Sequence, residues 1–433
     1  MSRLLVLGAG VSGAAVAHLA THLGHAVTVY DAEPPSQDLA GAATAVGTWD
    51  PLLLSGVDLV VTSPGFSERS APVVDTLEAG LPIVGEIEFA WRHLPPRPCV
   101  AVTGTNGKTT VTELVSEMLE HSGLRAPALG NIGTPLSEAV VDPPDALVVE
   151  VSSFQLRFVE SFRADAAVLL NLAPDHLDWH GSFAAYAAAK ARVFERQRPS
   201  DVAVYDADDM GAVQLAAGSA ARRIPVSGRR LPEGGGGVVS GRLVVGPVSA
   251  RVDELGVTDP AFLLDLAAAC AAAIEVGAEP DAVLETWRTF RPGPHRRTLV
   301  AELGGVAFVD DSKATNPHAA LAAIRSYPSV VLIAGGLAKG LDVSPLVHES
   351  NVRRVVALGT AAADLLAADP DRVEVAPSME AAVRIAAAAS SAGDTVLLAP
   401  GCASFDMFES YARRGDAFAA AVRELVHEGE KVP

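Results

Sequence analysis

Short apolar runs alternate with amphipathic stretches along most of the chain, and the runs end at glycines or polar residues. Runs bounded in this way indicate buried strands, whereas apolar residues three and four positions apart indicate helices. Regular alternation of the two predicts an α/β fold with parallel sheets. The expected strands are residues 4–7, 26–30, 58–62, 98–102, 146–151, 167–170, 306–309, 330–334, 355–358 and 395–398.

Two proline-rich stretches, at residues 95–98 and 291–296, interrupt this pattern and indicate domain boundaries. We therefore expect three domains: a Rossmann-like N-terminal domain over residues 1–93, a central P-loop ATPase-type α/β domain over 94–297, and a Rossmann-like C-terminal domain over 298–433. Within the central domain, the glycines at 234–237 suggest the tip of a hairpin.

Composition narrows the class of protein. The chain has 433 residues, 49% of them hydrophobic, which is enough to fill several cores, and a net charge of −19, which argues against nucleic acid or an anionic membrane as partner. Three widely separated cysteines suit a reducing compartment without disulfides or zinc. The first expected strand leads directly into a glycine motif, which is not the pattern of a signal peptide. The apolar run at 261–274 is interrupted by Asp265, so we do not expect it to span a membrane. We expect a cytoplasmic monomer without membrane insertion.

The strongest motif follows the strand at 98–102. A glycine turn, Gly-Lys-Thr and a helix come next, which is the order of a phosphate-binding loop. Glycines let backbone N–H groups face phosphates, Lys108 can reach the β- and γ-phosphates, and Thr109 can hold Mg²⁺. Val102 stands where such loops usually carry their first glycine, and an ordinary strand–helix turn is the alternative. The predicted ATP-binding residues here are Gly104, Thr105, Asn106, Gly107, Lys108, Thr109 and Thr110.

Other polar residues of the central domain also follow strands. Glu150 ends one strand, Asp175 and His176 follow the next, and Ser182 can cap a helix that carries Lys190. Since strand ends share one edge of a parallel sheet, these side chains could converge on the phosphate loop. Taken singly, Glu150 is as well explained as a helix-capping carboxylate as by metal binding, and the same holds for His176. A lysine on a helix, such as Lys190, is usually a solvated surface residue.

The chain opens with a second glycine motif. Gly8-Ala-Gly-Val-Ser-Gly13 follows the first strand, and Asp31 ends the next one, as in dinucleotide-binding βαβ units. Alone this motif suggests NAD or FAD, but it fits any nucleotide laid on the turn. The turn Ser63-Pro64-Gly65 follows the strand at 58–62 and would lie on the same edge.

Three polar loops of the C-terminal part also follow strands. They contain Asp311 and Lys313, then Lys339, then Ser404 with Phe405. Two lysines and a serine at strand ends suit an anionic small molecule. Turn chemistry alone explains Ser404 equally well.

Taken together, these motifs resemble the Mur ligase family across nearly the whole chain. The resemblance rests on Gly104-Thr-Asn-Gly-Lys-Thr109, Glu150 before Ser152-Ser-Phe-Gln155, Asn171 with Asp175-His176, Lys190, His295-Arg296, Asp311-Ser-Lys-Ala-Thr-Asn316, Gly335-Gly336 with Lys339, and Ser404. The Ser-Lys-Ala-Thr-Asn run and the Ser404 loop are most similar to the D-glutamate-adding members.

The resemblance implies ATP-driven amide synthesis on a UDP-linked peptidoglycan precursor, through an acyl phosphate that an amino acid then attacks. It implies ATP and Mg²⁺ as cofactors, a carbamylated Lys190, and small molecules as the only partners. Implied catalytic residues are Lys108, Asn131, His176 and Lys190, and implied metal-site residues are Thr109, Glu150, His176 and Lys190. Further implied sites are Arg296, Asp311 and Lys313 for ATP; Gly10, Val11, Ser12, Asp31, Ser63, Pro64 and Gly65 for the UDP part; and Thr315, Lys339, Ser404 and Phe405 for the amino acid.

One region departs from the family. Its members usually carry a His-Asn pair and a later Asn near adenine, whereas this chain has Asp259-Pro260 and Asp265. Two other functions compete with the resemblance: an NAD-dependent oxidoreductase, based on the first glycine motif, and a nucleotide-switched regulatory module without chemistry. An oxidoreductase function would leave the phosphate loop and the C-terminal lysines without a role.

Overall fold

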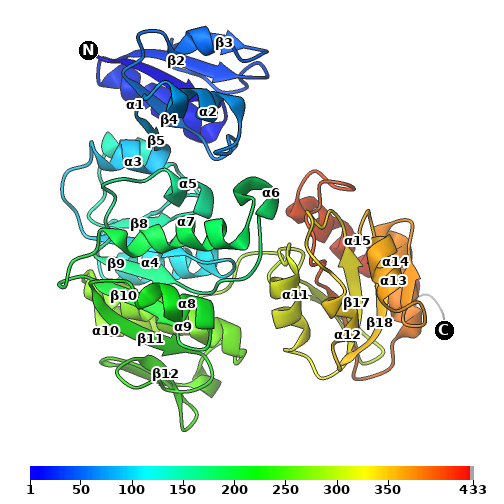
Figure 1. Ribbon diagram of the computed structural model, residues 1–433. Helices are drawn as coiled ribbons and strands as arrows, with labels where there is room; N and C mark the ends of the chain where they lie inside the picture. Colours follow the sequence, from blue (N-terminus) through cyan, green and yellow to red (C-terminus); the bar gives the residue numbers. More distant parts are fainter. Residues whose placement is uncertain (430–433) are drawn as a thin grey trace. The chain divides into compact units, whose positions relative to one another are not determined.

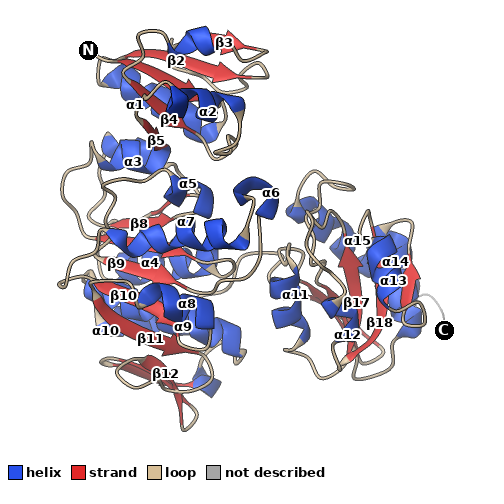
Figure 2. Ribbon diagram, viewed as in Figure 1, coloured by secondary structure: helices blue, strands red, loops and turns tan. Residues whose placement is uncertain are grey.

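A computed structural model describes residues 1–429, and these form two compact units. Unit 1 comprises Met1–Ala173 with Trp179–Phe290, and unit 2 comprises Pro174–Asp178 with the stretch that begins at Arg291. Both units are built from β-sheets with flanking helices, which confirms the predicted α/β class (Figures 1 and 2). The described helices include none that is both long and apolar enough to cross a membrane.

The first sheet of unit 1 has the strand order β3-β2-β1-β4-β5, and all of its neighbouring strands are parallel. In β1, Leu4 and Val6 pack into one core while Leu5 and Leu7 pack into another, so the strand is buried on both faces. The elements are β1 Arg3–Leu7, α1 Val11–His22, β2 Ala26–Asp31, β3 Ala43–Val46, η1 Pro51–Leu54, β4 Leu59–Thr62, α2 Ala71–Glu78, β5 Ile83–Gly85 and α3 Glu86–Trp91.

The second sheet of unit 1 has the order β14-β13-β12-β11-β10-β9-β6-β8-β7. Pairing is parallel from β7 to β12 and antiparallel among β12, β13 and β14. The strands are β6 Cys99–Thr103, β7 Ala128–Gly130, β8 Leu147–Glu150, β9 Ala166–Leu169, β10 Val202–Asp206, β11 Arg222–Ser227, β12 Gly236–Val239, β13 Arg242–Val245 and β14 Val248–Arg251. The helices are α4 Lys108–His121, η2 Leu136–Val140, α5 Ser153–Arg157, α6 Leu177–His180, α7 Phe183–Glu195, α8 Met210–Ala216, η3 Val252–Glu254, α9 Pro260–Glu275 and α10 Pro280–Thr289.

The glycines at 234–237 are not a hairpin tip, and that prediction was wrong. Gly236 and Gly237 lie inside β12, and the hairpin between β12 and β13 turns instead at Ser240 and Gly241. A Cβ on Gly236 would lie 2.8 Å from a Val245 methyl, and one on Gly237 would collide with the Arg230 carbonyl. These glycines are needed for close backbone approach within the sheet.

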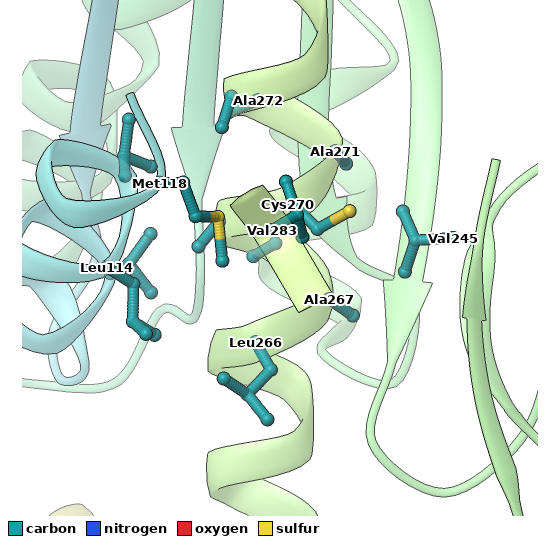
Figure 3. Packing of buried hydrophobic residues seen from close by; sticks show 14 of the residues in the cluster. Leu114, Met118, Val245, Leu266, Ala267, Cys270, Ala271, Ala272 and Val283 are labelled. Carbon is teal, nitrogen blue, oxygen red and sulfur yellow. The ribbon is translucent and has the colours of Figure 1, made fainter. Parts of the chain in front are cut away.

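The helix that follows the phosphate loop packs against the alanine-rich helix. Figure 3 shows Leu114 and Met118 of α4 beside Leu266 of α9, whereas the sulfur of Cys270 points toward Val245; all of these residues are buried. The small side chains of α9 allow close approach of its neighbours, and burial of this apolar surface stabilises the arrangement at roughly 25 cal/mol per Å². The start of α4, where the phosphate loop ends, is therefore fixed by a dense core.

Unit 2 contains a six-stranded sheet of order β15-β16-β20-β17-β18-β19. Only the β15–β16 pair is antiparallel. The strands are β15 Thr298–Leu303, β16 Val306–Asp310, β17 Val330–Gly335, β18 Val352–Leu358, β19 Val373–Val375 and β20 Thr395–Leu398. The helices are α11 Pro317–Ile324, α12 Pro345–His348, α13 Ala362–Ala368, α14 Met379–Ala389 and α15 Tyr411–Gly429.

All ten strands expected from the sequence are present, with ends shifted by a few residues. Those the pattern missed are mostly short or partly exposed, such as β3, β7, β14 and β19, because such strands carry little apolar signal.

Candidate active site

The phosphate loop joins β6 to α4 and needs its two glycines. Gly104 and Gly107 have φ of +155° and +85°. A Cβ on Gly104 would lie 3.1 Å from Leu170 Cβ, and one on Gly107 would lie 2.8 Å from an Asp265 carboxylate oxygen. Any other residue would therefore be strained and crowded at either position. The loop has the backbone of a phosphate cradle even though Val102 replaces the usual first glycine.

Asn171, two residues after the buried end of β9, fixes the conformation of this loop. Its Oδ1 accepts from Asn106 N at 2.8 Å, its Nδ2 donates to Asn106 O at 3.2 Å, and its carbonyl accepts from Thr105 N at 3.0 Å. The Thr105 hydroxyl also lies 2.9 Å from the Tyr186 hydroxyl. Thr105 and Thr110 are buried, so they shape the loop from within. An asparagine at a strand end was the only sequence signal for this support.

Two lysines donate to the same carbonyl of the loop. Lys108 Nζ lies 2.9 Å from Gly104 O and 2.9 Å from Thr105 O, while Lys190 Nζ lies 2.7 Å from Gly104 O. Lys190 is only 1% exposed, and its Nζ lies 4.8 Å from the centre of the Tyr186 ring. The solvated-lysine alternative for Lys190 is therefore wrong, and the sequence prediction that it approaches the phosphate loop is confirmed.

Glu150 lies beside the loop at the end of β8, in register with Val102 of β6. It is 2% exposed; Oε1 accepts from Asn131 Nδ2 at 2.7 Å, whereas the buried Oε2 has no hydrogen-bond partner. It caps no helix, since the following helix α5 is capped by Ser152. A buried carboxylate oxygen without a partner is costly, and a cation is one group that would satisfy it.

The described residues contain no cluster of three or more His, Cys, Asp or Glu arranged to hold a metal. This is compatible with Mg²⁺, which commonly takes one or two carboxylates and completes its shell with phosphates and water. Glu150 Oε2 and the half-buried Thr109, in the first turn of α4, are oxygen donors of the required kind. The residues present therefore fit Mg²⁺ bound together with a phosphate ligand.

Asp175 and His176 lie in the short segment that groups with unit 2. His176 has φ of +51°, rare for a residue with a side chain, and its Nε2 lies 3.6 Å from Asp175 Oδ2. Asn316, at the start of α11, donates from Nδ2 to Asp175 Oδ2 at 3.3 Å. The segment is thus tied to a loop of unit 2, and the convergence of His176 with Glu150 and Lys190 stays a prediction.

In the N-terminal sheet, Asp31 supports the first glycine turn. Its Oδ2 accepts from Ala9 N at 2.7 Å. A Cβ on Gly8 would lie 2.8 Å from Ser63 Oγ, so the turn and the loop after β4 are in close contact. Gly10, Val11 and Gly65 are exposed, while Ser12, Ser63 and Pro64 are half-buried, which leaves an open edge for a ligand.

Asp311 and its arginine neighbour form a charged centre in unit 2. Burial raises the pKa of the Asp311 carboxyl from 3.8 to about 6, against the opposing effect of Arg297. Arg297 N donates to Asp311 Oδ1 at 3.2 Å, and Arg297 Nε lies 4.0 Å from Oδ2. The sequence analysis predicted a role for Arg296, which is half-buried, and missed the adjacent Arg297. The φ of +51° at Arg297 is an unusual backbone conformation.

The three polar loops of unit 2 are joined by backbone hydrogen bonds. Gly401 N donates to Ala314 O at 2.9 Å, and Leu337 and Ala403 exchange bonds of 2.9 and 3.0 Å. These bonds bring together the loops that carry the predicted amino-acid site. Of its members, Ser404 is 2% exposed, Phe405 is 69% exposed, Thr315 and Lys339 are half-buried, and Lys339 has φ of +53°.

The unusual aspartates lie at the start of α9 and beside the phosphate loop. Asp259 caps α9 by accepting from Phe262 N at 3.2 Å, and Asp265 approaches the Gly107 position. The capping role explains Asp259 without a ligand. Asp265 thus contributes a carboxylate to the phosphate-loop region, which the sequence did not indicate.

Family models match three consecutive stretches of the chain. Residues 2–85 match the Mur ligase MurD-like N-terminal domain, residues 102–228 the Mur ligase middle domain, and residues 295–402 the Mur ligase glutamate ligase domain. Together these stretches contain both glycine motifs and the Asp311 and Lys339 loops.

Curated relatives match over nearly their full length. The chain is 45% identical to a UDP-N-acetylmuramoylalanine–D-glutamate ligase of Frankia casuarinae, over 97% of this chain and 93% of that protein. It is 42% identical to the protein of the same name from Thermobifida fusca, over 98% of each.

Solved structures share the fold. A pseudomurein peptide ligase type C from Methanothermus fervidus has a TM-score of 0.63 at 17% identity, covering 98% of this chain and 100% of that chain. MurF from Thermotoga maritima, in complex with ADP, has a TM-score of 0.59 at 17% identity, covering 92% of this chain and 95% of that chain.

Proposed function

The chain belongs to the Mur ligase family, and from this premise we propose that it joins D-glutamate to UDP-N-acetylmuramoyl-L-alanine, with ATP converted to ADP and phosphate. This reaction is a step of peptidoglycan precursor synthesis. It is the reaction given in the names of relatives that are 45% and 42% identical to this chain. The observation that carries the proposal is the phosphate loop, with two lysines on one carbonyl and an unsatisfied buried Glu150 oxygen beside it.

The reaction needs little covalent participation from the protein. The substrate carboxylate attacks the γ-phosphorus of ATP, the bond to the ADP oxygen breaks, and an acyl phosphate forms. The D-glutamate amine then attacks the acyl carbon, phosphate leaves, and the amine loses a proton. In both steps negative charge develops on phosphate or carbonyl oxygens, so rate enhancement comes mainly from positioning and charge neutralisation.

Lys108 acts on the transferred phosphate. Its ammonium is hydrogen-bonded to the Gly104 and Thr105 carbonyls. A phosphate is a stronger, charged acceptor, so Lys108 turns toward it when ATP lies on the N–H groups of the loop. Arg296, Asp311 and Lys313 act on the nucleotide or the transferred phosphate, as the resemblance implies.

Mg²⁺ supplies charge neutralisation on the phosphates when it is bound. Thr109 and Glu150 would hold it, and the resemblance implies that His176 also serves a Mg²⁺ site. Asn131, which donates to Glu150 Oε1 at 2.7 Å, orients this carboxylate and presents its remaining polar groups to the substrate near the reacting carboxylate.

Lys190 is carbamylated in the active enzyme. Two ammonium groups on one carbonyl repel each other in a low-dielectric setting, and an ammonium has no lone pair to offer a metal. When the neutral Lys190 amine adds CO₂, an N–C bond forms, a proton is released, and an anionic carboxylate-like group replaces a cation. The product relieves the repulsion and adds the oxygen donors that Mg²⁺ prefers.

The remaining sites follow the three predicted domains. Residues 1–93 bind the UDP part through Gly10, Val11, Ser12, Asp31 and the Ser63-Pro64-Gly65 turn; residues 94–297 bind ATP. Residues 298–433 bind D-glutamate through Thr315, Lys339, Ser404 and Phe405. The enzyme acts as a cytoplasmic monomer on these small molecules.

An assay of ADP release with a panel of amino acids tests the function. We expect release only when UDP-N-acetylmuramoyl-L-alanine and D-glutamate are both present, with a product larger by one glutamyl residue. Amino-acid-independent nucleotide hydrolysis alone would favour the regulatory module. Thermal stabilisation by NAD but not by UDP compounds would favour the oxidoreductase.

A further inference from the structure

Arg414 is a buried arginine at the start of α15, and it connects the polar loops of unit 2. It is 3% exposed. Its Nε donates to Ser312 Oγ at 3.0 Å, Nη2 to Ser312 O at 2.9 Å and Nη1 to Cys402 O at 3.0 Å. One guanidinium therefore spans the loop after β16 and the loop after β20.

The same guanidinium also lies close to the backbone of the third loop. A Cβ added to Gly336, just after β17, would lie 3.2 Å from Arg414 Nη1. Arg414 therefore contacts every loop in which the amino-acid site is proposed, namely those that carry Thr315, Lys339 and Ser404.

Arg414 forms no ion pair with any described residue. Its three acceptors are neutral oxygens, and burial lowers the pKa of its guanidinium to about 10, although Asp406 and Asp310 act in the opposite direction. Asp310 instead pairs with His295 Nδ1 at 2.7 Å. A buried cation without a carboxylate partner is an expensive way to hold a loop, and its charge favours an anion nearby.

Neighbouring residues of α15 reinforce this arrangement. The Ser312 hydroxyl donates to Tyr411 O at 2.7 Å, and Lys313 Nζ lies 5.0 Å from the centre of the Tyr411 ring. A Cβ on Gly415 would collide with His295 and Asp310, so α15 packs tightly against the end of β16. The first turns of α15 thus contact Asp310, Ser312 and Lys313.

We propose that Arg414 is a positioning residue for D-glutamate: it holds the loops after β16, β17 and β20 in the spacing that the amino acid's two carboxylates require, and adds a positive charge beneath them. It acts through Ser312 and Cys402, without touching the substrate. The proposal rests on the proposed function.

The test compares Arg414→Met, Arg414→Lys and Ser312→Ala with the unmodified enzyme in assays of phosphate release. Misplaced loops should raise the KM for D-glutamate by about tenfold or more in Arg414→Met, because small displacements of binding groups have large effects. The KM for UDP-N-acetylmuramoyl-L-alanine should change by about twofold or less, since the proposed UDP site lies in the N-terminal sheet. The KM for ATP should rise less than the KM for D-glutamate, because Asp311 and Lys313 share the loop of Ser312 while the phosphate loop is left unchanged.

Arg414→Lys keeps a cation but cannot span both loops with one planar group, so the D-glutamate KM should still rise. Ser312→Ala should give a smaller rise, and the combined Ser312→Ala/Arg414→Lys variant should be less than additive, because the two residues act as one unit. The matched control is Arg353→Met, which removes an arginine paired with Asp394 in the same unit. It should leave the D-glutamate KM unchanged.

Equal increases in all three KM values, or a wild-type D-glutamate KM in Arg414→Lys, would overturn the proposal. If Arg414→Met does not fold, the Ser312→Ala and Arg414→Lys data decide. Failure of the proposed function is recognised separately, because the unmodified enzyme would then release no phosphate in response to D-glutamate.

Discussion

The phosphate loop of unit 1 and the polar loops of unit 2 use cations in opposite ways. In unit 1, Lys108 and Lys190 donate to the carbonyl of Gly104, a residue of the loop that is to receive phosphate. In unit 2, Arg414 is buried and hydrogen-bonded to two loops, and Lys313 lies over an aromatic ring. Both regions lie at the carboxyl ends of parallel strands.

The difference concerns which groups must move. Lysine is a point charge on a flexible chain, so Lys108 can exchange a carbonyl for a phosphate oxygen with little rearrangement. Arginine makes several fixed hydrogen bonds, so Arg414 is suited to set a shape. We therefore expect the proposed phosphate site to hold its cations ready for reaction, and the proposed amino-acid site to use a cation as structure. The following variants test this contrast.

Lys108→Ala should abolish ligation while leaving the fold intact. Loss of one charge contact to a transferring phosphoryl group costs on the order of a hundredfold or more in rate. The measurements are turnover at saturating ATP and the thermal unfolding midpoint. Arg125→Ala, which removes an arginine paired with Asp142 in the same unit, is the control and should remain active. Near-wild-type turnover of Lys108→Ala would contradict the phosphate-loop assignment.

Lys190→Ala should be nearly inactive and partly restored by formate. The alanine variant vacates a buried space beside the phosphate loop, where a small carboxylate can replace that of the carbamate. Lys190→Met fills the same space with an apolar chain, so formate should not restore it. The measurements are turnover with and without formate, and the intact mass of the unmodified protein for an added carboxyl group. Full activity of Lys190→Ala would contradict a role at the metal.

Lys339→Ala should raise the KM for D-glutamate more than the KM for ATP, if Lys339 belongs to the amino-acid site as we propose. The acceptor should be D-glutamate and not L-glutamate, since inversion at the α-carbon directs the amine away from the acyl phosphate. Steady-state kinetics with both enantiomers measure these effects. Equal use of L-glutamate, or an unchanged D-glutamate KM in the variant, would exclude the proposed pocket.

Asp311→Asn should stabilise unit 2 above pH 6 while it impairs activity. Because burial raises the folded-state pKa of Asp311 from 3.8 to about 6, the stability associated with its proton is present below about pH 4 and is lost as the pH rises through 6. Removing this titration should therefore raise the free energy of unfolding at pH 7 by up to about 3 kcal/mol.

Denaturant unfolding between pH 4 and 8 measures the effect of Asp311→Asn. Asp371→Asn, which removes an exposed carboxylate from the same unit, serves as the control for a lost surface charge. An unchanged pH dependence in Asp311→Asn would show that another group is responsible.

Local sequence was sufficient for the features that depend on a few neighbouring residues. The glycines of the phosphate loop were found because φ above zero at Gly107 and crowding at Gly104 exclude other residues. Ser182 was identified as a cap because its hydroxyl accepts from Ala185 N within the same turn. The prediction of a hairpin tip at 234–237 was wrong because Gly236 and Gly237 are required by close contacts with Val245 and with the Arg230 carbonyl. No local pattern in the sequence reveals these contacts.

The sequence by itself determined the α/β class, the ten main strands and the phosphate loop, because apolar periodicity and glycine geometry act over short stretches of chain. Only the tertiary structure decided which residues the polar side chains contact: Lys190 with Gly104, Arg297 with Asp311, and Arg414 with Ser312 and Cys402. These pairs are separated by 12 to 102 positions in the chain. Their proximity depends on how strands and helices pack, since burial and pairing of a charge are properties of the assembled fold.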